Sequence, residues 1–89
     1  MPKTPLDPDV ADRAPEDPVV TAYDREHLIT YLRLLDAETD RAEWCEVARL
    51  VLHRDPDVDP VRARTAWESH LARAHWLRNS GYKDLLRQK

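Results

Sequence analysis

The stretch Asp55-Pro56-Asp57-Val58-Asp59-Pro60 decides the fold, because it separates two segments with helical patterning. Each proline removes a backbone donor and biases the aspartate before it toward extended geometry. Asp59 stands where a helix N-cap is expected, and Pro60 stands at the first helical position. We therefore expect a helix from Pro60 to about Asn79, with Gly81 as its stop.

The segment before this turn has the pattern of a shorter helix that opens at Asp40. The Asp40 carboxylate can accept from the Glu43 N–H while the Glu43 carboxylate reaches back, which is a capping box with Asp in place of Ser or Thr. Inward-facing residues follow at helical spacing: Trp44, Val47, Ala48 and Val51. A short helix, a turn and a longer helix are typical of a helix-turn-helix module.

Further helices complete the predicted fold. Residues 25–37 are predicted to form a helix capped by Asp24, with Leu28, Tyr31, Leu32 and Leu35 facing inward. The inward stripe of the long helix is Ala63, Trp67, His70, Ala74 and Leu77. Tyr82, Leu85 and Leu86 indicate a short last helix. We expect an all-α fold: a small helix-turn-helix variant with an extended acidic turn, three main helices and a short C-terminal helix.

The chain is predicted to divide into a tail, residues 1–22, and a helix-turn-helix-like domain, residues 23–89. The tail holds five prolines, five acidic residues and few large apolar side chains, so we expect it to be disordered. A folding unit this short buries a modest share of its surface and has little room for a deep catalytic cavity.

The composition argues against several classes of protein. No stretch approaches the roughly 18 apolar residues of a membrane span, and we expect no secretory signal and a cytoplasmic location. Cys45 is the only cysteine, which rules out an internal disulfide and fits a reducing cytosol. No glycine-rich phosphate loop or nucleophile motif is present, so we expect neither an enzyme nor a small-molecule substrate.

The histidines do not indicate a metal site. They stand at positions 27, 53, 70 and 75 and lack the spacing at which side chains converge on a metal ion. We expect each histidine to be a surface or boundary side chain, and we expect no metal and no cofactor.

Charge is unevenly distributed along the chain. The formal net charge is −3; residues 23–59 carry five basic and ten acidic residues, whereas residues 60–89 carry seven basic and two acidic residues. The predicted domain is neutral but polarised. This polarity can serve solubility and intramolecular attraction alone.

For a DNA-binding protein, the start of the long helix would face the bases with Arg62, Arg64, Thr65 and Glu68. The turn and the shorter helix oppose this use, because they carry an acidic face where backbone phosphates would pass. The residues of that face are Glu43, Glu46, Asp55, Asp57 and Asp59. Since non-specific DNA affinity is mostly electrostatic, we expect no useful DNA affinity.

Protein binding is another use of the surface. Three large apolar residues do not belong to the predicted inward stripes and are expected on the outer sides of their helices: Leu34, Leu50 and Trp76. Trp76 shares its side with Arg62 and Arg73, and tryptophan beside arginine is typical of an interface anchor. These five residues form the predicted partner-binding site, with the alternative that the short C-terminal helix folds over Trp76 and buries it.

Four segments together resemble a known family: residues 22–28, residues 47–53, the Asp-Pro turn and residues 64–74. The run Ala-Trp-Glu-Ser-His-Leu-Ala-Arg-Ala in the last segment is the most specific. The family consists of uncharacterised helical domains of proteobacteria, encoded largely on integrative and conjugative elements. The resemblance covers about residues 22–87.

The resemblance implies a helix-turn-helix variant that is used in two opposed ways. Behind a second domain it contacts DNA in transcriptional activators of excision and transfer; alone it resembles an antiactivator in quorum sensing. The acidic turn and the expected lack of a second domain favour an antiactivator, which would bind a transcriptional activator or a quorum-sensing regulator and block excision and transfer genes. The alternative is a DNA-binding regulator that uses the helix from Pro60, and a purely structural partner protein stays open.

Overall fold

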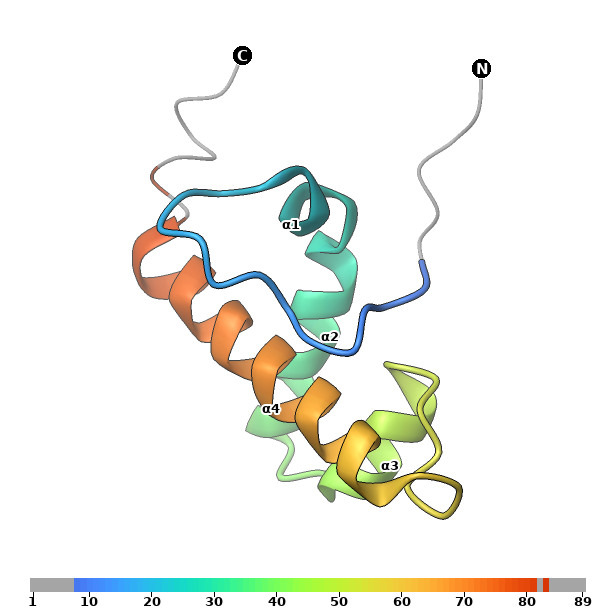
Figure 1. The fold of residues 1–89 in the computed structure, drawn as a ribbon. Coiled ribbons are helices and arrows are strands. Elements are labelled where there is room, and N and C mark those ends of the chain that lie inside the picture. The colour runs from blue at the N-terminus through green and yellow to red at the C-terminus, as the bar shows by residue number, and fades with distance from the viewer. Residues whose placement is uncertain (1–7, 82, 84–89) are drawn as a thin grey trace, which may run out of the picture.

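The computed structural model describes residues 8–81 and Lys83. The helices of this part are α1 (Ala22–Glu26), α2 (Leu28–Thr39), α3 (Trp44–Leu50), α4 (Pro60–Trp76) and the π-helical turn η1 (Leu77–Gly81). Residues 8–81 contain no strand, which confirms the expected all-α fold. Both α2 and α3 pack against α4, the central element of the domain (Figure 1).

The start of α4 is the one predicted from the Asp-Pro turn. The Asp59 carboxylate accepts from the Arg62 N–H at 3.0 Å, and Pro60 is the first helical residue. The buried side of α4 is rich in alanine, with Ala63, Ala66 and Ala74 each at most 2% exposed. Small side chains let neighbouring helices approach closely, so this alanine-rich side suits a central helix.

The predicted helix over residues 25–37 is instead two helices. Thr21, rather than Asp24, caps α1: its hydroxyl accepts from the Asp24 N–H, and the Asp24 carboxylate accepts from the Thr21 N–H. Helix α2 then continues to Thr39 and ends at Asp40, so the capping box predicted from Asp40 to Glu43 is wrong. The chain turns at the next residue, Arg41, which has a left-handed φ of 59°.

Helix α2 buries a side that agrees with the predicted one only in part: Tyr31 is buried and Leu35 packs against the core, as predicted. Its buried row runs from His27 through Thr30 and Tyr31 to Leu34, whereas Leu32 is 57% exposed. The sequence offered two overlapping rows, and the buried one contains polar residues that form internal hydrogen bonds. Counting only apolar residues therefore placed Leu32 inward and missed Thr30 and Leu34.

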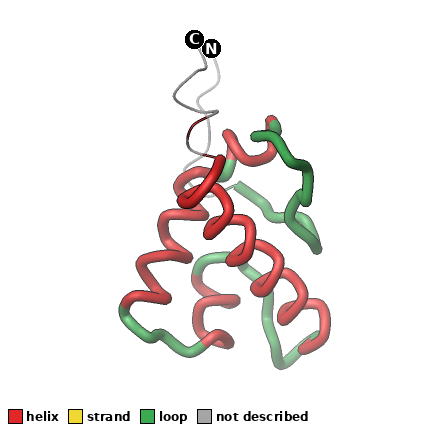
Figure 2. Tube along the Cα trace, turned by 90° about the vertical axis from the view of Figure 1, so that its left-hand side faces the viewer, coloured by secondary structure: helices red, strands yellow, loops and turns green. Residues whose placement is uncertain are grey.

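Residues 8–21 are called the N-terminal segment below, and they run along α4 (Figure 1). In the turned view they form a loop on one side of the helices (Figure 2). Val10, Ala14 and Val20 are buried, and the Ala14 N–H donates to Ser69 Oγ at 3.0 Å. The prediction of a disordered tail is therefore wrong for these residues. A proline-rich extended chain can bury small apolar side chains when a neighbouring helix supplies its hydrogen-bond partners. Residues 1–7 lie outside the described residues.

The short C-terminal helix was predicted from Tyr82, Leu85 and Leu86. All three residues lie outside the described part of the chain. The same holds for the alternative in which that helix covers Trp76.

A buried ion pair joins the N-terminal segment, α1 and α4. Arg73 donates from Nη2 to Asp24 Oδ2 at 2.7 Å and from Nε to Asp24 Oδ1 at 3.0 Å, and the Tyr31 hydroxyl donates to the same carboxylate. Arg73 also donates to the carbonyls of Asp17 and Val19. Burial would raise the pKa of the Asp24 carboxyl, but the hydrogen bonds from Arg73, the Thr21 N–H and Tyr31 outweigh it and lower that pKa.

His27 and His70 are 3% and 0% exposed, so the prediction that each histidine lies at the surface or boundary is wrong for these two, whereas the placing of His70 in the inward stripe of the long helix is confirmed. Both nitrogens of His27 lie 2.7 Å from backbone carbonyl oxygens. For His70, Nδ1 lies 2.7 Å from the Ala66 carbonyl and must donate to it, so Nε2 accepts from the Tyr23 hydroxyl at 2.6 Å. The Tyr23 hydroxyl accepts in turn from the Ala11 N–H, which links this core network to the N-terminal segment.

The His70 network predicts a loss of stability in weak acid. Burial lowers the pKa of His70, and the neighbouring His27 and Arg54 lower it further. The unfolded chain therefore takes up a proton near pH 6.5 before the folded chain does, so the free energy of unfolding should fall as the pH drops below about 6.5. Urea denaturation of the wild type and of His70→Gln at a series of pH values checks this. An equal pH dependence in both proteins would contradict it.

The described residues lack two other kinds of feature. No helix among them is long and apolar enough to cross a membrane. Their histidine, cysteine and acidic side chains form no group of three that could hold a metal ion.

Candidate nucleic-acid interface

The side of α4 that faces away from the core carries a row of outward-facing residues. We call it the exposed row of α4; its members are Val61, Arg64, Thr65, Glu68 and Ala72. Their spacing of three and four places them on one side of the helix. The row begins in the first turn of α4, directly after the Asp-Pro turn, and its first member, Val61, is 74% exposed. Of the residues predicted to face DNA bases, Arg64, Thr65 and Glu68 lie here.

Two tryptophans hold Arg64 in place. Its guanidinium carbon lies 4.9 Å from the ring centre of Trp44 and 5.0 Å from that of Trp67. The two ring centres are 6.0 Å apart. Glu68 pairs with Arg64 Nε at 3.1 Å. Since Nε is the guanidinium nitrogen farthest from the tip, this pair leaves the two terminal nitrogens able to meet a ligand. Trp44 was predicted as a core residue, but it is half-buried and helps to orient a surface cation.

Arg62 was predicted to face the bases and also to bind a partner, but it lies beside the exposed row. Its Nε lies 2.6 Å from Asp12 Oδ1 in the N-terminal segment, and Arg54 Nη2 lies 3.1 Å from the same oxygen. The hydrogen bond and the negative charge of Asp12 raise the pKa of Arg62. The hydrogen bond from Arg62 lowers the pKa of Asp12. The sequence could not show this cluster, because Asp12 was assigned to a disordered tail.

The predicted acidic face is exposed, but its aspartates have local partners. Arg49 lies 3.5 Å from the Asp55 carboxylate and 3.2 Å from that of Asp57, and Asp59 caps α4. Glu43 and Glu46 lie at the start of α3 and are exposed. The negative charge of the turn is thus partly offset by Arg49 and by the N-terminus of α4. Its net effect on a nearby phosphate is smaller than the acid count suggests.

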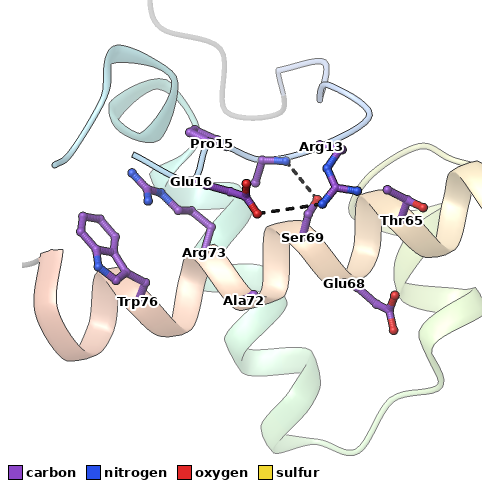
Figure 3. A pocket seen from close by; sticks show the side chains of 10 residues that line it. Arg13, Pro15, Glu16, Thr65, Glu68, Ser69, Ala72, Arg73 and Trp76 are labelled. Carbon is purple, nitrogen blue, oxygen red and sulfur yellow. Dashed lines mark hydrogen bonds and ion pairs between the residues drawn. The ribbon is translucent and has the colours of Figure 1, made fainter. Parts of the chain in front are cut away.

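A groove of about 410 Å³ lies between the N-terminal segment and α4 (Figure 3). Arg13 and Glu16 form one wall, and the α4 wall includes Thr65 and Glu68 of the exposed row. Trp76 stands at one end, with the Arg73 guanidinium 4.0 Å from its ring centre. The N-terminal segment therefore borders the exposed row and brings Arg13, 65% exposed, close to it.

The predicted partner-binding residues do not form one surface. Leu34 is 1% exposed and Arg73 is 5% exposed, so the prediction that both lie on an outer surface is wrong. Leu34 belongs to the buried row of α2, and Arg73 is held by Asp24 and by two backbone carbonyls. Leu50 is 67% exposed, as predicted, and Trp76 is half-buried. Two of the five residues on which the antiactivator interpretation depended are therefore buried.

Comparison with known proteins adds one finding. The family model RovC_DNA-bd, described as "T6SS, Transcription factor, DNA binding domain", matches residues 5–87. No curated protein matches the chain. The match contradicts the prediction that DNA binding is unlikely. The predicted role in transcription regulation agrees with it.

Proposed function

The chain belongs to the RovC DNA-binding domain family of T6SS transcription factors, and we propose that it binds duplex DNA through the exposed row of α4. The observation that carries this proposal is the position of the row. It begins in the first turn of α4, the longer helix that follows α3 and the Asp-Pro turn, and the corresponding helix of a helix-turn-helix module contacts base edges. A cytoplasmic location follows from the proposal, because the DNA is there.

The residues of the exposed row suit the major groove. Arginine can contact guanine O6 and N7 with two hydrogen bonds, glutamate can accept from cytosine N4, and valine can contact a thymine methyl group. Arg64, Glu68 and Val61 stand in this row, and Trp44 and Trp67 already orient the Arg64 guanidinium. A pre-oriented side chain loses less entropy on binding, which favours sequence-specific contact.

The net charge of −3 is compatible with DNA binding. Phosphate contacts depend on the charges that lie near the DNA, and electrostatic interactions between exposed charges fade beyond about 10 Å at moderate salt. Arg13 lines the groove beside the exposed row, and Arg62 lies on the flank of α4. Both arginines lie on the side of α4 next to the N-terminal segment, where phosphates beside a bound helix would pass.

Duplex binding with a steep salt dependence is the expected result. Selection from a pool of random duplexes at about 50 mM salt should enrich a short motif, and the affinity should fall steeply at higher salt. Arg64→Glu should weaken binding to that motif by about 100-fold or more, because it removes a base contact and repels phosphates. Fluorescence anisotropy on the enriched duplex measures both effects.

Arg25→Glu is the matched control. Arg25 is an exposed residue of α1, outside the exposed row, and the substitution changes the net charge by the same amount. Affinity within a few-fold of the wild type is expected for it. Equal losses for Arg25→Glu and Arg64→Glu, or no duplex binding by the wild type at low salt, would overturn the proposed function.

A further inference from the structure

Two arginines from different elements converge on one carboxylate at the edge of the exposed row. Asp12 Oδ1 lies 2.6 Å from Arg62 Nε in the first turn of α4 and 3.1 Å from Arg54 Nη2 in the turn after α3. The side chains of Asp12 and Arg62 are 54% and 53% exposed, so solvent reaches the cluster. Arg54 is 21% exposed and also donates to the Val10 carbonyl at 2.6 Å, which holds its guanidinium in position.

Guanidinium groups that meet at one anionic oxygen form the donor arrangement that also binds a phosphate oxygen. The cluster lies on the flank of α4, where the phosphates of a DNA strand pass when a recognition helix enters the major groove. We infer that Arg54 and Arg62 form a binding site for a DNA backbone phosphate, and that Asp12 fills this site in the free domain. The inference rests on the proposed function.

Asp12 then acts as a competitor of DNA within the same chain. A group held on a short tether has an effective concentration of the order of mM, so the phosphate must displace it. Other acids close to the cluster already have partners: Asp55 pairs with Arg49, and Asp59 caps α4. Neutralising Asp12 should therefore free the two arginines, whereas neutralising another acid of the segment should not.

The test compares Asp12→Asn with Asp9→Asn in the full chain, using fluorescence anisotropy on the enriched duplex. Asp12→Asn should bind about three- to ten-fold more tightly than the wild type, because the phosphate no longer displaces a carboxylate. Asp9→Asn removes the same charge from the same segment, and Asp9 is exposed. It should change affinity by less than about two-fold.

A second pair of variants asks whether the effect depends on the arginine. Arg62→Ala should weaken DNA binding. When Asp12→Asn is added to Arg62→Ala, the increase in affinity should be less than half of the increase that Asp12→Asn gives in the wild type. Circular dichroism at each step shows that the variants are folded.

The outcomes separate the two proposals. A gain that is specific to Asp12 and depends on Arg62 supports the phosphate site. Equal gains for Asp12→Asn and Asp9→Asn, or a full gain without Arg62, would show a general charge effect and overturn it. Failure of every folded variant to bind any duplex would overturn the proposed function together with this inference.

Discussion

Arg73→Ala is expected to destabilise the domain by about 3–5 kcal/mol, because it leaves the Asp24 carboxylate buried without its counter-charge. Arg73 is 5% exposed and Asp24 is 0% exposed, so water cannot replace the lost partner without opening the core. The substitution also removes the donors to the carbonyls of Asp17 and Val19, which hold the N-terminal segment. Since small domains are stable by about 5–15 kcal/mol in total, much of the variant should be unfolded at 37 °C. Urea denaturation followed by circular dichroism measures the change.

Arg64→Ala is the matched control, because it is the same substitution in the same helix. Arg64 pairs with Glu68 at the surface, where an ion pair contributes at most about 1 kcal/mol. If Arg73→Ala destabilised the domain no more than Arg64→Ala does, the buried pair would not be the main link between the N-terminal segment and α4. Asp24→Asn, which keeps the shape of the side chain and removes its charge, should resemble Arg73→Ala.

The same pair makes the domain sensitive to strong acid. The pKa of Asp24 is lowered in the folded state, so the unfolded chain binds a proton first as the pH falls. The contribution of the pair is present above about pH 3.9, the ordinary pKa of aspartate, and is lost as the pH falls below it. The stability difference between the wild type and Asp24→Asn should therefore shrink below about pH 4.

The sequence predicts the parts of this fold that depend on local signals. Asp59 and Pro60 fix the start of α4 because an N-cap and a first-turn proline act within one turn of helix. The buried row of α2 depends instead on distant partners. His27 contacts the carbonyl of Asp9, and Tyr31 donates to Asp24, whose carboxylate also accepts from Arg73 in α4. These hydrogen bonds make polar residues part of the core, and no periodicity of apolar residues reveals them.

The N-terminal segment shows the same limit. Its prolines and acidic residues give it the composition of a disordered tail, yet Val10 and Ala14 are buried. The Ala14 N–H donates to Ser69, and the Val10 carbonyl accepts from Arg54. Its order comes from surfaces that exist only after α4 and the turn have folded. A chain can thus have a disordered composition and still form part of a core.

The candidate site was predicted in part. Helical spacing correctly groups Arg64, Thr65 and Glu68, because residues three and four apart share a face. The acidic residues of the turn were misleading because their formal charges were considered without their partners. Arg49 pairs with two of the aspartates of the turn, and Asp59 caps α4, so each has a structural role that a charge sum does not show.

Arg64→Lys is expected to separate base reading from charge. Lysine keeps the positive charge but lacks the planar fork that contacts guanine O6 and N7 together. Affinity for the selected motif should fall by about 1–3 kcal/mol, which is roughly 5- to 150-fold, while affinity for unrelated duplexes should change by less than about two-fold. Competition binding with the selected and an unrelated duplex measures both values for each variant.

The salt dependence gives the control for this prediction. A residue that contacts a base leaves the slope of log affinity against log salt nearly unchanged when it is replaced by lysine, since no phosphate contact is lost. Arg64→Ala and Arg64→Lys should then lose similar specificity. If lysine instead restored wild-type binding to the motif, Arg64 would act as a phosphate contact. The orientation imposed by Trp44 and Trp67 would then have no role in sequence recognition, because a flexible ammonium group would serve equally well.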